Sequence, residues 1–110
     1  MQVRDWIYVG DHCSAIDAII RHGKIGQTYT VSGGNELRNI DLIRKIITSL
    51  GKDPTSVINF VKDRPGHDVR YALNHSKITK ELGWKPEMTF ERGLKLTINY
   101  YRNKFNSVNI

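Results

Sequence analysis

Apolar and polar positions recur with two different periods along this 110-residue chain, and these periods predict both helices and strands. The clearest helical pattern follows Asn39, where apolar residues return every three or four positions until Gly51. Similar stripes lie between Asp11 and Gly23 and after Thr89. Asn39, Asp11 and Thr89 are each expected to cap a helix, because their side-chain oxygens can accept free backbone N–H groups. Gly23 is expected to be a left-handed stop residue.

Short runs rich in β-branched and aromatic residues predict strands between these helices. The runs cover residues 3–9, 27–31 and 57–61, with a short extended piece at 71–73. A further helix is expected from Asn74 to Leu82, closed by Gly83. The whole pattern predicts a small mixed α/β lobe with short strands and about four helices.

Length and composition indicate one domain over residues 1–110, with 39% apolar residues to fill one modest core. No apolar run approaches the roughly 20 residues that span a bilayer, so no membrane partner and a soluble, cytoplasmic protein are expected. The single cysteine, Cys13, cannot form an internal disulfide.

The net charge of +6 would suit an anionic partner. Lysines and arginines are nevertheless scattered from Arg4 to Lys104 among acids, and no basic run carries the interleaved aromatics that stack on bases. We therefore expect no nucleic-acid partner. The histidines and Cys13 do not have the spacing of a zinc site, so no metal site is expected.

The run Asp63-Arg64-Pro65-Gly66-His67 has the composition of an anion-binding turn. Pro65 and Gly66 favour a type II turn, which places the side chains on either side of it close together. Arg64 offers a planar fork suited to phosphate, and His67 adds a ring N–H donor. A surface turn whose charges pair with one another is the alternative.

This run, which continues as Asp68-Val69-Arg70-Tyr71-Ala72, resembles the C-terminal third of dTDP-glucose 4,6-dehydratases, which are extended short-chain dehydrogenase/reductase enzymes. Arg4-Asp5-Trp6 upstream and Glu81-Leu82-Gly83-Trp84-Lys85-Pro86 downstream follow the same family's order, as does Gly33-Gly34-Asn35-Glu36. The resemblance covers about residues 3–103. It implies a C-terminal nucleotide-sugar-binding lobe without the N-terminal Rossmann domain, a probable fragment of a larger enzyme.

The resemblance also implies a substrate site that binds a dTDP-sugar. Its residues are Arg4, Asn39, Asp63, Arg64, Pro65, Gly66 and His67. Arg4 matches an arginine that contacts the diphosphate, but an ion pair with Asp5 or Asp11 is the alternative. For Asn39, a capping role and a substrate-binding role can coexist.

In the intact family, NAD oxidises the sugar at C4, water is lost across C5 and C6, and hydride returns to C6. This chain has no glycine-rich loop of the NAD-binding type after a first strand, and the family's catalytic residues match nothing in it. Tyr100 and Lys104 mimic the spacing of the family's catalytic pair, but they lie near the chain end. We expect the chain alone to bind no cofactor and to be inactive.

Two functions stay open from the sequence. The chain is either the dTDP-glucose-binding portion of a 4,6-dehydratase, or a standalone binding or interaction module derived from such a lobe. An apolar face left by the missing half could also support a homo-oligomer.

Overall fold

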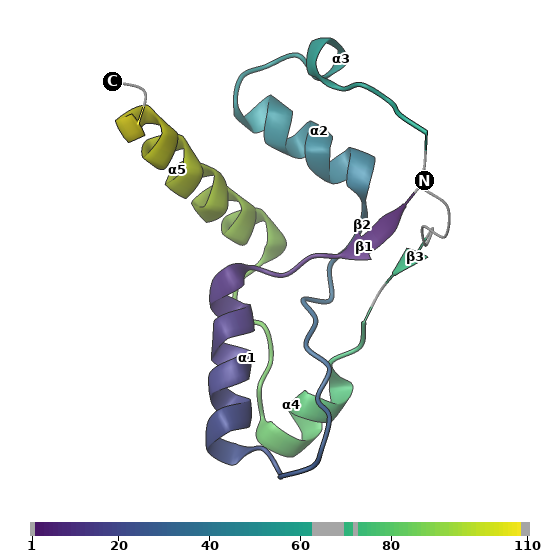
Figure 1. Cartoon of the computed structure of the whole chain (residues 1–110), viewed down its shortest axis with the longest axis vertical. Helices are drawn as coiled ribbons and strands as arrows, with labels where there is room; N and C mark the ends of the chain where they lie inside the picture. The colour runs from purple at the N-terminus through teal and green to yellow at the C-terminus, as the bar shows by residue number, and fades with distance from the viewer. Residues whose placement is uncertain (1, 63–69, 72, 109–110) are drawn as a thin grey trace.

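The computed structural model describes residues 2–62, 70–71 and 73–108 and confirms a mixed α/β fold. Its elements, in chain order, are β1 (Val3–Asp5), α1 (Val9–His22), β2 (Glu36–Arg38), α2 (Asn39–Ser49), α3 (Pro54–Val57), β3 (Arg70–Tyr71), α4 (Ser76–Leu82) and α5 (Phe90–Val108) (Figure 1).

The three strands form one sheet in the order β2-β1-β3. The central strand β1 runs antiparallel to β2 and parallel to β3. Val3 is the register point of the sheet, since it lies opposite Arg38 on one side and Arg70 on the other. Strands far apart in sequence therefore meet at the first residues of the chain.

Below the sheet, α1 and α4 lie side by side and enclose a small core (Figure 1). Ala15, Ile78 and Trp84 are its buried members. The indole N–H of Trp84 donates to Ser14 Oγ of α1 at 2.9 Å, so the ring is fixed at both its apolar face and its polar edge.

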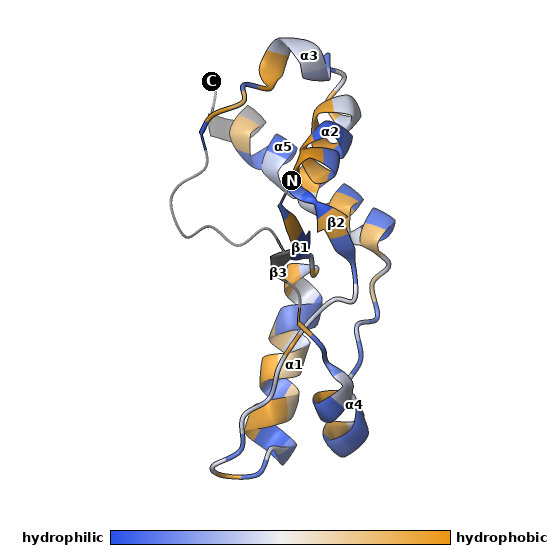
Figure 2. Cartoon of the chain, turned by 90° about the vertical axis from the view of Figure 1, so that its right-hand side faces the viewer, coloured by the Kyte–Doolittle hydropathy of each residue, from blue (hydrophilic) through white to orange (hydrophobic). Residues whose placement is uncertain are grey.

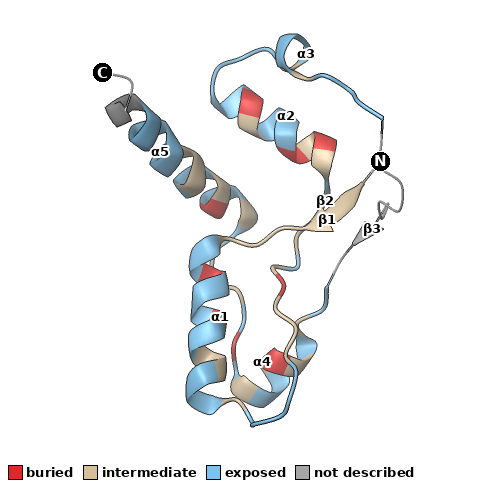
Figure 3. Cartoon of the chain, in the orientation of Figure 1, coloured by how far each residue is buried: buried red, intermediate tan, exposed pale blue. Residues whose placement is uncertain are grey.

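Above the sheet, α2 and α5 run from the sheet region toward the opposite end of the molecule (Figures 1 and 2). The expected apolar stripe of α2 divides in the structure. Ile40 and Ile47 are buried, whereas Ile43 and Leu50 remain 43% and 38% exposed. Figure 3 shows the same contrast on α5, where Gly93 is buried and residues 99–105 are exposed. The core is therefore concentrated near the sheet and around Ile78.

Asp11 does not cap α1, contrary to the sequence prediction. The helix begins earlier, at Val9 after Tyr8, and Asp11 lies buried in its first turn. Its two carboxylate oxygens accept the backbone N–H groups of Glu87 and Met88 at 3.2 and 3.0 Å. Asp11 thus fixes the segment that leads into α5, a contact between residues that are far apart in sequence.

The predicted strand over residues 27–31 is also wrong. This segment has no strand partner among the described residues, and side chains fix it instead: Lys77 Nζ donates to Gln27 Oε1 and to the carbonyl of Thr28. The antiparallel partner of β1 is β2, at Glu36–Arg38. Sequence analysis predicted no strand at these residues. A strand needs a neighbour for its backbone hydrogen bonds, and a local pattern does not reveal one.

Residues 57–61 do not form the predicted strand: Val57 ends the short helix α3, and residues 58–61 form neither helix nor strand. Asp53 caps this helix through Thr55 N, and Pro54 occupies its first turn. The two predicted glycine stops had different outcomes. Gly83 has the left-handed φ of 72° and ends α4 as predicted. Gly23 also ends its helix, α1, but its φ of −67° is not left-handed.

Replacing Asp11 by Ala should lower the free energy of unfolding by about 2 to 4 kcal/mol, because two backbone N–H groups lose a charged acceptor. Asp17→Ala on the same helix is the matched control. Asp17 is exposed and only forms an ion pair with Arg21, so its loss should cost at most about 0.5 kcal/mol. Urea unfolding monitored by circular dichroism measures both, and equal losses would contradict the role given to Asp11.

Candidate nucleotide-sugar site

The sheet register brings two segments together at one end of β1, which we call the Gln2 end. The chain leaves β2 at Arg38 and enters α2 at Asn39, whose backbone N–H donates to the Gln2 carbonyl at 2.9 Å. On the other side of β1, the chain enters β3 at Arg70, opposite Val3. The N-terminus of α2 and the entry to β3 therefore flank the same few residues of β1.

Arg4 lies in the middle of β1, opposite Leu37 on β2 and Tyr71 on β3. The residue is half-buried, and its Nη1 donates to the Val3 carbonyl at 2.8 Å. A guanidinium on the central strand is thus placed next to both flanking segments.

Asp5 holds the glycine-containing loop that precedes β2, a role that sequence analysis missed. Its carboxylate accepts Gly33 N at 3.2 Å and Asn35 N at 2.7 Å. The Asn35 amide donates in turn to the carbonyl of Trp6 at 3.1 Å. Only glycine fits at position 33, since a Cβ there would lie 2.2 Å from that Trp6 carbonyl oxygen.

The two acids once considered as ion-pair partners of Arg4 have other roles. Asp5 binds the loop at Gly33 and Asn35, and Asp11 binds the backbone before α5. Backbone N–H groups are therefore partners of both carboxylates.

Asn39 does not cap α2, which corrects the capping prediction. It is the first residue of the helix, and the cap position belongs to Arg38, whose side chain makes no capping hydrogen bond. Asn39 Oδ1 is buried and has no hydrogen-bond partner in the described part of the chain. A buried acceptor without a donor is uncommon in proteins.

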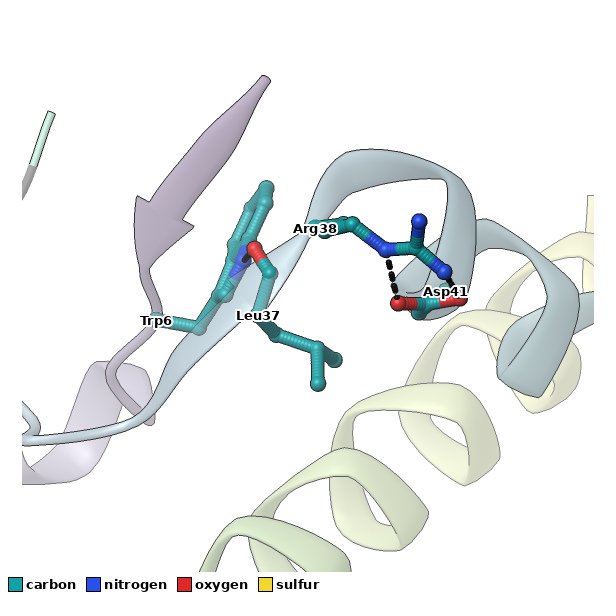
Figure 4. A network of polar contacts seen from close by, with 4 residues as sticks. All are labelled: Trp6, Leu37, Arg38 and Asp41. Atoms are coloured by element: carbon teal, nitrogen blue, oxygen red, sulfur yellow. Dashed lines mark hydrogen bonds and ion pairs between the residues drawn. The ribbon is translucent and has the colours of Figure 1, made fainter. Parts of the chain in front are cut away.

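Arg38 and Asp41 form a two-pronged ion pair across the first turn of α2 (Figure 4). Arg38 Nε and Nη2 donate to the two oxygens of Asp41 at 2.7 and 3.1 Å. The hydrogen bonds from Arg38 lower the pKa of the Asp41 carboxyl below its ordinary value of 3.8. The same contact raises the pKa of Arg38. Nearby, Trp6 Nε1 donates to the Leu37 carbonyl at 3.2 Å and ties β1 to β2 (Figure 4).

The other predicted site residues, Asp63, Arg64, Pro65, Gly66 and His67, lie outside the described residues. The structure therefore leaves their placement untested. Of the predicted set it places Arg4 on the central strand β1 and Asn39 directly after the neighbouring strand β2.

Tyr100 is 61% exposed and packs edge-on against Tyr101 on α5, with ring centroids 5.1 Å apart. No cluster of three or more potential metal ligands occurs among the described residues. None of the described helices is both long and apolar enough to cross a membrane.

Comparison with known proteins shows the family of the chain. The family model described as GDP-mannose 4,6 dehydratase matches residues 1–97, and the chain belongs to this family of nucleotide-sugar enzymes. Among curated relatives, a dTDP-glucose 4,6-dehydratase of Xanthomonas campestris pv. campestris strain B100 is 46% identical over 108 residues. That match covers 91% of this chain and 31% of the relative.

Solved structures show the same relationship. A dTDP-glucose 4,6-dehydratase from Streptomyces venezuelae, determined with NAD and TYD bound, superposes with a TM-score of 0.87 at 41% identity. The dTDP-glucose 4,6-dehydratase of Bacillus anthracis, in complex with NAD, gives 0.84 at 44% identity. These matches cover 93% and 94% of this chain but 31% and 32% of the solved chains. The chain thus spans about a third of the length of the enzymes it matches.

The Arg38–Asp41 pair predicts a pH-dependent contribution to stability. Because the pKa of Asp41 is lowered in the folded state, the pair stabilises the fold above the ordinary pKa of 3.8 and loses this effect as pH falls through the folded-state value. A double-mutant cycle of Arg38→Gln and Asp41→Asn should therefore show favourable coupling at neutral pH that weakens as the carboxyl of Asp41 is protonated in acid. Thermal melts of the four proteins measure it. Coupling that persists in acid would contradict the ion pair.

Proposed function

We propose that this chain is the nucleotide-sugar-binding part of a dTDP-glucose 4,6-dehydratase, the enzyme that converts dTDP-glucose to dTDP-4-keto-6-deoxyglucose. The observation that carries the proposal is the register of the sheet at the Gln2 end. Arg4 lies on the central strand, Asn39 follows one neighbour, and the run ending at His67 comes shortly before the other. Residues from three distant parts of the sequence can thus contact one ligand.

The chemistry of these groups suits a diphosphate. Arg4 and Arg64 supply guanidinium forks, which bind phosphate oxygens with two parallel hydrogen bonds. The N-terminus of α2 adds backbone N–H groups that no side chain caps, together with the positive end of the helix dipole. His67 supplies a ring N–H donor, and Pro65 and Gly66 give the turn its shape, with Asp63 at its start.

NAD does not fit the described residues. The loop at Gly33 and Gly34 is the glycine-rich candidate, but the N–H groups of Gly33 and Asn35 already donate to Asp5. We therefore derive no redox step from this chain. Its role in the enzyme is positional: contacts to the nucleotide and diphosphate hold the hexose, and that remote binding energy supports chemistry carried out elsewhere.

Calorimetric titration with dTDP-glucose tests the proposal. Because the chain spans only part of its relatives, we expect weak binding, with a Kd of about 0.1 to a few mM. Arg64→Ala should weaken binding about tenfold to a hundredfold, since a charge-assisted contact contributes about 1.5 to 3 kcal/mol. Arg4→Ala should have an effect of similar size.

Lys80→Ala is the matched control, because Lys80 is an exposed cation on α4, away from the sheet (Figure 1). Its affinity should equal that of the unmodified chain. Circular dichroism of each variant separates loss of binding from loss of fold. Equal weakening by Arg64→Ala and Lys80→Ala would show that diffuse positive charge, and no specific diphosphate site, binds the nucleotide.

A further inference from the structure

The C-terminal half of α2 and the adjoining face of α5 form an open groove of about 470 Å³. Its floor consists of the apolar side chains of Ile46, Leu50, Leu94, Ile98, Tyr101 and Phe105. Its lining residues come from the end of α2, from Lys52 shortly after it, and from α5 between Leu94 and Phe105. It is separate from the Gln2 end, because Asn39 begins α2 whereas Leu50 follows its last residue.

The aromatic part of the floor is strongly exposed. Tyr101 is 49% and Phe105 59% exposed, and their rings stack on one another at a centroid distance of 6.3 Å. Together with Leu50 at the end of α2, they present apolar surface that nothing in the described chain covers. A continuous exposed apolar groove marks a binding surface more often than scattered single apolar residues do.

The rim of the groove is positively charged. Lys52 and Arg102 line it, and Lys95 lines an adjoining depression that also includes Arg102. Within the described residues these three cations have no ion pair or hydrogen bond from their side chains. The acid nearby, Glu91, already pairs with Lys45 at 3.4 Å. The groove thus combines an apolar floor with cations that lack acidic partners.

We propose that this groove docks an acidic amphipathic helix of a partner protein. An amphipathic helix lays apolar residues spaced at i, i+3, i+4 and i+7 into a groove between two helices, and its acidic flanks would meet Lys52, Lys95 and Arg102. The groove is lined by aliphatic side chains from both helices and by aromatic side chains from α5. Such a lining suits a row of leucine side chains on the partner helix.

Charge disfavours a second copy of this chain as the occupant. The described part of α5 carries Arg92, Lys95, Arg102 and Lys104 against the single acid Glu91. Two copies packed through this helix would bring like charges together, which is destabilising. Nucleic acid would satisfy the cations, but it has no aliphatic ridge to cover Ile46, Leu50, Leu94 and Ile98.

Fluorescence anisotropy tests the proposal with a labelled peptide of about 18 residues, composed of Leu, Ala and Glu with leucines at helical i, i+3/i+4 spacing. The full 110-residue chain should bind it saturably and lose at least about tenfold in affinity between roughly 0.05 and 0.5 M salt. A peptide of the same composition with scattered leucines, and one with Lys in place of Glu, should each bind at least about tenfold more weakly.

Two variants of the chain locate the contact. Lys95→Glu/Arg102→Glu and Phe105→Ser should each weaken binding of the amphipathic peptide at least about tenfold. The matched control is Arg92→Glu/Lys104→Glu, which makes the same charge change on the same helix at positions that do not line the groove. It should bind within about twofold of the unmodified chain.

Any of four results would overturn the proposal. These are absence of binding, equal binding of the scattered-leucine peptide, equal loss in the control variant, and tighter binding of a single-stranded oligodeoxynucleotide that the groove variants abolish. Sedimentation of the chain alone tests the remaining possible occupant, a second copy of the chain. Concentration-dependent dimers that Phe105→Ser dissociates would assign the groove to that second copy.

Discussion

The arrangement at the Gln2 end depends on the carboxylate of Asp5. It accepts two backbone N–H groups of the loop at residues 33–35, and this loop leads directly into β2. Charge-assisted hydrogen bonds of this kind contribute roughly 1.5 to 3 kcal/mol each. By fixing the loop, Asp5 fixes which residues of β2 face Val3 and Arg4. A slip of β2 by one residue would turn Leu37 to the other face of the sheet and move Asn39 away from Gln2.

A second acid, Asp11 at the start of α1, also accepts two backbone N–H groups. These groups lie before α5, just as those bound by Asp5 lie before β2. Both carboxylates thus satisfy backbone donors of segments that are distant in sequence.

Local patterns were sufficient for features that depend on neighbouring residues. The main helices, the stop at Gly83 and the cap at Thr89, whose Oγ1 accepts Arg92 N, follow from spacing and capping chemistry alone. The short helix α3 also has a local signal, Asp53 before Pro54, which the apolar run at 57–61 obscured. Strand pairing was not predictable in this way, because β2 became a strand only through its contact with β1.

The candidate site shows the same difference between features that depend on neighbouring residues and contacts that are distant in sequence. Arg4 and Asn39 were predicted as site residues through a family resemblance, and the structure places Arg4 on β1 and joins Asn39 to Gln2 at the start of that strand. The roles of Asp5 and Asp11 escaped sequence analysis because each depends on backbone groups at least 28 residues away. Gly33 was a sequence signal for the fixed loop. A glycine can be required where two backbone segments approach closely, and here the neighbouring segment is the carbonyl of Trp6.

The central claim is that strand register gathers the nucleotide-sugar site at the Gln2 end. The most direct measurement is a ¹H–¹⁵N correlation spectrum of the labelled chain during titration with dTDP-glucose. The account predicts saturable shifts that cluster at the amides of Gln2, Val3, Asn39 and Arg70, with α4 and the C-terminal half of α5 unchanged. Shifts that saturate on those two helices while Val3, Asn39 and Arg70 stay still would contradict it.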